Sequence, residues 1–193
     1  MAALFPMILT SCKNKPEVDK SNPFFSEFNT PFGVPPFEKI MAKHYMPAFE
    51  AGMAEGRKKI DKIIKNEEEP TFDNTVVAYD QSSDLLTKVS NVFFAQAEAN
   101  TNDSIQAIEV EISPKLAEYY DEIKLNPELF KRVKAVYDNQ SKFNLNPEQT
   151  FMLENFYKSF VRNGANMNKE DQDTLKKINQ RLSVLTVKFE QNV

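Results

Sequence analysis

The chain has 193 residues, of which 41% are hydrophobic and 27% charged, a composition that excludes a wholly disordered protein. Its net charge of −4 gives no basic footprint, so we expect no nucleic-acid partner. The single cysteine, Cys12, excludes a disulfide within the chain, and together with the single histidine, His44, it is too little for a zinc site built from Cys and His.

The first twelve residues have the pattern of a lipoprotein signal. Residues 1–11 (MAALFPMILTS) are apolar and uncharged, too short to span a bilayer, and typical of the hydrophobic part of a secretory signal. Leu9-Thr10-Ser11 precede Cys12 as small residues precede the acceptor cysteine of a bacterial lipobox. We therefore expect residues 1–11 to be a signal-peptide remnant and Cys12 to be lipidated, with residues 12–22 as a polar tether to the membrane.

Lipidation would place the protein in the cell envelope, on the periplasmic side or at the outer membrane. No basic residue precedes the apolar run, although secretory signals carry one. Two alternatives therefore stay open: a frayed N-terminus with a free cysteine, and a cytoplasmic protein.

Residues 22–37 (NPFFSEFNTPFGVPPF), called the arm below, combine four prolines with five phenylalanines. The prolines forbid a regular helix, and five rings left in water would be unfavourable. We predict an extended arm whose rings pack onto a helical body. The functional alternative is an aromatic platform for a ligand. The rings are those of Phe24, Phe25, Phe28, Phe32 and Phe37.

The rest of the chain predicts an all-α fold of about six antiparallel helices. Pro47 is expected in the first turn of a helix that runs to about Asn66. Gly52 and Gly56 within that helix predict the close approach of another backbone, with a weak segment of the helix as the alternative. Thr71 is expected to cap the next helix, over residues 72–99.

The clearest helical period lies in residues 105–123, where apolar residues recur at steps of three and four. Asn126 and Asn146 each precede a Pro-Glu pair and are expected to cap the next two helices. Gly164 is expected to end the second of these.

Asn168 is expected to cap a last helix, on which four apolar residues share one face: Ile178, Leu182, Leu185 and Phe189. This pattern continues to the end of the sequence, without a terminal glycine, proline or polar tail. We therefore expect residues 23–193 to be a helical region that is incomplete at its C-terminus, and this apolar face to lack part of its packing partner.

Five further stretches of the sequence can be compared with known families: residues 29–40 (NTPFGVPPFEKI), 44–50 (HYMPAFE), 70–78 (PTFDNTVVA), 125–133 (LNPELFKRV) and 160–165 (FVRNGA). These stretches resemble the M3 family of zinc oligopeptidases, in particular its bacterial peptidyl-dipeptidase type. The resemblance covers about residues 22–193, and the stretches agree with the family in order and spacing.

The resemblance implies the N-terminal portion of a larger, helical, two-lobed peptidase built around a deep channel. The whole enzyme would hydrolyse short peptides and release C-terminal dipeptides, with zinc held by an HExxH helix and a further Glu. HExxH is absent from this chain, so no catalytic, zinc-binding or substrate-binding residue is assigned. His44 is expected to be a half-buried hydrogen-bonding residue, with substrate contact as the alternative.

We therefore predict that the chain forms a channel wall and is inactive alone. Zinc would belong to the parent enzyme, and the chain's partners would be short peptides, a C-terminal catalytic part and, through the lipid, the membrane. The alternative function is that of a non-catalytic helical lipoprotein, a binding or scaffold module.

Overall fold

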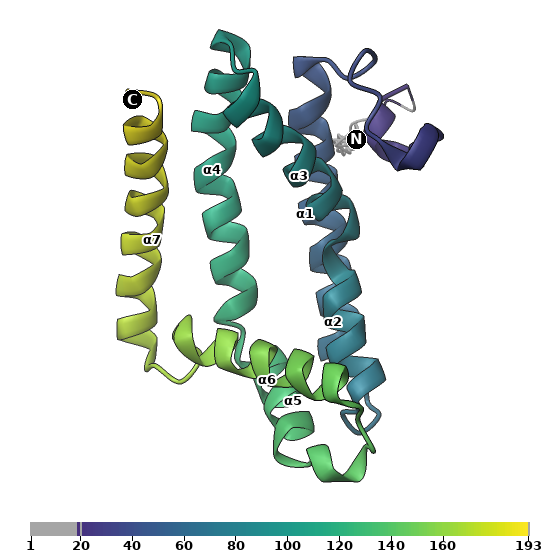
Figure 1. Ribbon diagram of the computed structural model, residues 1–193. Helices are drawn as coiled ribbons and strands as arrows, with labels where there is room; N and C mark the ends of the chain where they lie inside the picture. Colours follow the sequence, from purple (N-terminus) through teal and green to yellow (C-terminus); the bar gives the residue numbers. More distant parts are fainter. Residues whose placement is uncertain (1–18, 20, 193) are drawn as a thin grey trace, which may run out of the picture.

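The computed structural model describes Asp19 and residues 21–192, and within these residues the chain is helical and has no strands (Figure 1). The long helices of this part number six: α1 Ala42–Ile64, α3 Asp84–Ala99, α4 Asp103–Lys124, α5 Pro127–Asp138, α6 Pro147–Arg162 and α7 Lys169–Glu190. The predicted all-α class is confirmed. The predicted signal segment, Cys12 and most of the tether lie outside the described residues.

The long helices form two groups (Figure 1). α1, α3, α4 and α7 run roughly side by side, with α4 between α1 and α7, while α5 and α6 lie across one end of them. The apolar stripe that the sequence predicts on α4 faces the core, where Ile112, Leu116 and Tyr119 are buried beneath α1. The opposite side of α4 faces α7.

The first half of the arm packs as predicted. It forms a short 3-10 turn, η1 Pro23–Phe25, in which the Phe24 ring is buried 5.4 Å from the ring of Tyr45 in α1. Phe28 is partly buried and lies under the Lys88 ammonium of α3, 4.0 Å from nitrogen to ring centroid. The arm is thus attached to both α1 and α3.

The second half of the arm differs from the prediction. Phe32 is fully exposed and Phe37 is 47% exposed, so the expectation that all five rings pack onto the body is wrong. Phe32 lies in a second 3-10 turn, η2 Pro31–Gly33, with a positive φ of 59°. This turn, set between prolines, carries the ring into solvent and away from the helices.

α1 begins at Ala42, earlier than the predicted start near Pro47. The Met41 N–H donates to Nδ1 of His44 over 3.1 Å, which satisfies one of the free donors at the helix start. Pro47 therefore lies inside α1, as its sixth residue and beyond the first turn where it was predicted, and its missing N–H removes one helical hydrogen bond. The helix ends at Ile64, near the predicted Asn66.

Both glycines of α1 are sites of close approach. A Cβ added to Gly52 would lie 2.9 Å from the backbone Cα and N of Leu86, so α3 touches α1 through its main chain, as predicted. A Cβ added to Gly56 would lie 2.0 Å from the hydroxyl oxygen of Tyr119 in α4, which is a side-chain contact. Small residues at these positions allow α3 and α4 to pack against α1.

The single helix predicted over residues 72–99 is wrong in detail, because the chain there forms four consecutive helical segments. A π-helical turn (η3 Phe72–Val77) is followed by α2 Ala78–Asp80, a 3-10 turn (η4 Gln81–Ser83) and then α3. The Ser82 hydroxyl donates to the Tyr79 carbonyl over 2.6 Å and competes with regular helical bonding at the break. The predicted cap is confirmed, since the Asn74 N–H donates to Thr71 Oγ1 over 3.1 Å.

The predicted asparagine caps are confirmed at α5, α6 and α7. Each side-chain oxygen accepts a backbone N–H of the first turn, as in the 2.8 Å bond from the Gln149 N–H to Asn146 Oδ1. Gly164, with a φ of +90°, follows the end of α6 as predicted.

The apolar face predicted on the last helix is exposed on α7. The exposed fractions are 55% for Ile178, 58% for Leu182, 48% for Leu185 and 72% for Phe189. α7 packs on α4 through a different side, where Val187 is buried. Most of its apolar face therefore has no packing partner among the described residues.

Candidate functional site

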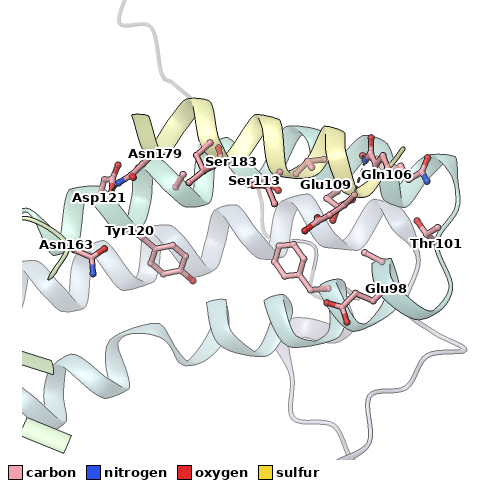
Figure 2. A pocket seen from close by; sticks show the side chains of 18 residues that line it. Glu98, Thr101, Gln106, Glu109, Ser113, Tyr120, Asp121, Asn163, Asn179 and Ser183 are labelled. Atoms are coloured by element: carbon pink, nitrogen blue, oxygen red, sulfur yellow. Dashed lines mark hydrogen bonds between the residues drawn. The ribbon is translucent and has the colours of Figure 1, made fainter. Parts of the chain in front are cut away.

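A groove of about 910 Å³ lies between α3, α4 and α7 (Figure 2). The side chains labelled there extend from Asn163 at one end to Thr101 at the other. Four carboxylates line the groove, and none of its lining residues is Lys, Arg or His. The acidic residues are Glu98, Glu109, Asp121 and Glu190.

The α4 side of the groove comes from a second periodic face of that helix. Glu109, Ser113, Ala117 and Asp121 follow one another at steps of four residues and therefore lie along one side. The apolar stripe of the same helix faces the core. The small residues Ser113 and Ala117 leave room between the two acids, and this room is part of the groove.

Amide side chains connect α7 to the two acids of α4. Asn179 Nδ2 donates to Asp121 Oδ1 over 2.7 Å, and Figure 2 shows the two side chains end to end. Gln191 Nε2 donates to Glu109 Oε2 over 3.3 Å and to the Gln106 carbonyl over 3.1 Å. These bonds hold α7 against α4 near both ends of the groove.

Both bonded acids are buried without a cation. Glu109 and Asp121 are each 9% exposed, and within the described part of the chain no Lys or Arg nitrogen lies within 4.0 Å of either carboxylate. Burial raises the pKa of Asp121 above its ordinary value of 3.8, against the opposing effects of the Asn179 hydrogen bond and the Lys176 charge. The groove therefore has a negative potential that these neutral amides, and the Lys176 charge near Asp121, only partly offset.

The raised pKa of Asp121 makes the pH dependence of an Asp121→Asn variant predictable. An acid with a raised folded-state pKa penalises folding above that pKa, and the penalty disappears as the pH falls below 3.8. We expect Asp121→Asn to be more stable than the parent chain at pH 7, with the difference shrinking as the pH approaches 3.8. Urea unfolding at both pH values measures this. A variant that is less stable than the parent at pH 7 contradicts the prediction.

The groove does not assemble a metal site from this chain. Among the described residues, no group of three or more His, Cys, Asp or Glu side chains is placed to hold a metal ion. Glu109 and Asp121 are 12 positions apart on α4, which corresponds to about 18 Å along a helix at 1.5 Å per residue. The two carboxylates therefore act separately.

No described helix combines the length and the apolar character needed to cross a membrane. This finding leaves the predicted lipidation of Cys12 as an expectation, since that residue lies outside the described part.

His44 lies at the junction of the arm and α1 and does not line the groove. It is 5% exposed, so it is more buried than the predicted half-buried state. Its Nδ1 accepts the Met41 N–H, and its carbonyl accepts from Asn22 Nδ2 over 2.9 Å. The predicted hydrogen-bonding role is confirmed for the side chain, while the backbone carbonyl of His44 connects Asn22 of the arm to the first turn of α1.

Burial of the imidazole, aided by the nearby Lys43 charge, lowers the pKa of His44 below its ordinary value of 6.5. Only the neutral ring can accept the Met41 N–H. The stabilisation that this hydrogen bond contributes is therefore complete above pH 6.5. It declines as the pH falls from 6.5 toward the lower pKa of the folded state. Because His44 is the only histidine, NMR titration of its ring proton reports this pKa directly. A value at or above 6.5 contradicts the prediction.

Comparison with known proteins gives a consistent set of relatives, although no family model matches the chain. The chain is 39% identical over 172 residues to the dipeptidyl carboxypeptidase of Escherichia coli K12 and 35% identical over 173 residues to that of Salmonella typhimurium LT2. It is 27% identical over 165 residues to oligopeptidase A of Escherichia coli K12. These alignments cover 89%, 90% and 85% of this chain. The chain spans about a quarter of the length of each relative.

Proposed function

Because this chain belongs to the M3 family of oligopeptidases, we propose that it forms a wall of the substrate channel in a zinc peptidase that releases C-terminal dipeptides from short peptides. The observation that carries the proposal is the 39% identity to a dipeptidyl carboxypeptidase over 89% of the chain. Since the chain spans about a quarter of that relative, the peptidase activity, the zinc and the peptide substrates are attributes of the proposed whole protein.

The chain would contribute shape and exclusion to such an enzyme, not bond cleavage. Its one histidine cannot supply the HExxH motif, which requires two. Helices α1 and α4 contain 23 and 22 residues, which corresponds to a length of about 33 Å each. Long helices packed side by side make a stiff surface, and a stiff channel wall admits narrow, unfolded peptides while it keeps folded chains out.

The proposed role as a channel wall predicts that the isolated chain has no peptidase activity. We expect the isolated chain, supplied with zinc, to release no dipeptide from a blocked peptide substrate above the rate of a protein-free blank. The physical reason is that it lacks the paired histidines and the Glu that activate a zinc-bound water. Dipeptide release that stops with a chelator and returns with added zinc would overturn the proposal.

We also propose that lipidation of Cys12 anchors the protein in the cell envelope. The supporting observation is the sequence pattern, an apolar run that ends in small residues directly before the cysteine. Labelled palmitate should be incorporated when the chain is expressed in bacteria, and Cys12→Ser should abolish the label and release the protein into the soluble fraction. An unlabelled parent chain in the soluble fraction would support the cytoplasmic alternative instead.

A further inference from the structure

We propose that Lys124 is a site of covalent modification, at which its side-chain amine is acylated by a small acyl phosphate. Lys124 is the last residue of α4, at the end of that helix where α5 and α6 lie across the long helices (Figure 1). It does not line the groove between α3, α4 and α7. The inference therefore stands independently of the proposed function.

Two aromatic rings lie against the Lys124 side chain, and we call these three residues the Lys124 site. Its Nζ is 4.7 Å from the ring centroid of Phe160 in α6 and 5.1 Å from that of Tyr79 in α2. The Phe160 side chain is fully buried, and the two rings pack together with 5.5 Å between their centroids. The ring faces attract a cation, but they also displace water that would hydrate it.

The Lys124 nitrogen has no anionic or hydrogen-bonding partner among the described residues. No carboxylate oxygen lies within 4.0 Å of it, and the side chain is only partly exposed. Burial therefore lowers the pKa of Lys124 from 10.5 to about 8. Burial also raises the pKa of Tyr79, so the same site disfavours charge on a second group.

A second partly buried lysine, Lys88, shows how a bound nitrogen differs from a free one. Burial lowers the pKa of Lys88 as well, and its Nζ lies 4.0 Å from the ring centroid of Phe28. Unlike Lys124, it donates to the backbone carbonyls of Phe24 and Ser26. These bonds hold the charged ammonium, so Lys88 is expected to react more slowly than Lys124.

The chemistry requires the neutral amine, because only its lone pair can attack a carbonyl carbon. Lys124 Nζ attacks the acyl carbon of the acyl phosphate, and a C–N bond forms. The bond from that carbon to the phosphate oxygen breaks, and inorganic phosphate leaves with the proton that the nitrogen gives up. The product is a neutral amide, which removes the charge from between the rings, and no oxidation or reduction takes place.

The test treats the 193-residue chain with acetyl phosphate at pH 7.5 and follows each lysine by peptide mass spectrometry. At this pH about a quarter of an amine with a pKa of about 8 is neutral, against about one in a thousand for an ordinary lysine. Lower basicity and partial burial reduce this advantage. We therefore expect Lys124 to be acetylated about tenfold faster than the exposed Lys131 of α5, with Lys88 between them. Equal rates for Lys124 and Lys131 would overturn the proposal.

Two further arms test whether the folded site causes the preference. In urea that unfolds the chain, Lys124 and Lys131 should react at equal rates, because the rings no longer surround the amine. Acetyl-CoA carries the same acetyl group on a much larger carrier, so its preference for Lys124 should be smaller than that of acetyl phosphate. A preference that persists in urea, or one seen only with acetyl-CoA, would overturn the proposal.

The pH dependence of the rate separates a reactive amine from one that is merely accessible. In the parent chain, the Lys124 rate should reach half its maximum near pH 8. Tyr79→Ser admits water to the site and should raise that midpoint by about one pH unit or more. Tyr137→Ser is the matched control, since it removes a partly buried tyrosine ring from α5 and should leave the midpoint unchanged.

Circular dichroism establishes which variants are folded. If Tyr79→Ser does not fold, the profile of the parent chain decides the question. A parent midpoint at or above pH 10, or an unchanged midpoint in folded Tyr79→Ser, would overturn the proposal.

Discussion

The Gly56→Ala variant is expected to be less stable than the parent chain by about 2 to 3 kcal/mol, although alanine is the better helix former. An added Cβ would lie 2.0 Å from the hydroxyl oxygen and 3.1 Å from Cζ of Tyr119. Tyr119 has little room to retreat, because its side chain is 1% exposed and its ring lies between the Arg57 guanidinium and the Tyr120 ring. The overlap therefore outweighs the gain of about 1 kcal/mol in helix propensity.

A double-mutant cycle with Tyr119→Phe isolates the cause. The Tyr119 hydroxyl is buried and has no hydrogen-bond partner in the described structure, so its removal alone should change stability by less than about 0.5 kcal/mol. In the Tyr119→Phe background, the Gly56→Ala penalty should shrink by about 1 to 2 kcal/mol. Urea unfolding of the four proteins measures the cycle. If the effects of Gly56→Ala and Tyr119→Phe on stability are fully additive, α4 does not contact α1 through Gly56 and Tyr119.

The Phe24→Ala variant is expected to lose about 3 kcal/mol of stability, while Phe32→Ala should change stability by less than about 0.5 kcal/mol. Phe24 is 1% exposed and packs against the rings of Tyr45 and Phe28, so its truncation leaves a cavity under the arm. Phe32 makes no comparable contact, since it is fully exposed. Alanine keeps the Cβ, so the strain of the positive φ at position 32 is unchanged.

Thermal unfolding and limited proteolysis of the arm measure this pair. In the Phe24→Ala variant the arm should detach first, so cleavage within residues 26–40 should become faster at temperatures below global unfolding. Phe32→Ala serves as the matched control for the loss of a ring from the same segment. Equal destabilisation by the two substitutions would contradict the packing of the arm.

The helix caps were predictable from sequence because capping is a local interaction. Asn126, Asn146 and Asn168 bind N–H groups two or three residues away, so their position in the sequence suffices. The start of α1 and the break at residues 80–83 were not predictable, because each depends on which of two competing hydrogen-bond patterns is favoured. The arm shows the same limit, since only tertiary packing distinguishes the buried Phe24 from the exposed Phe32.

The acidic groove between α3, α4 and α7 was missed, although part of its pattern is present in the sequence. The four-residue spacing of Glu109, Ser113, Ala117 and Asp121 marks a second face on α4, but such a polar face ordinarily lies in water. Only the position of α7 makes it a groove and buries its acids. The exposed ridge of α7, by contrast, follows from the spacing of its apolar residues.

The most direct measurement of the central claim replaces the matched quarter of the Escherichia coli dipeptidyl carboxypeptidase with residues 22–192 of this chain. If the chain is a channel wall of an M3 peptidase, the zinc-loaded chimera should release dipeptides with a kcat/KM within about tenfold of the parent, because the cleavage machinery is intact and the wall is equivalent. Deletion of the same quarter, without replacement, should abolish release. A folded, zinc-loaded chimera without dipeptide release would contradict the claim and favour a separate binding or scaffold role.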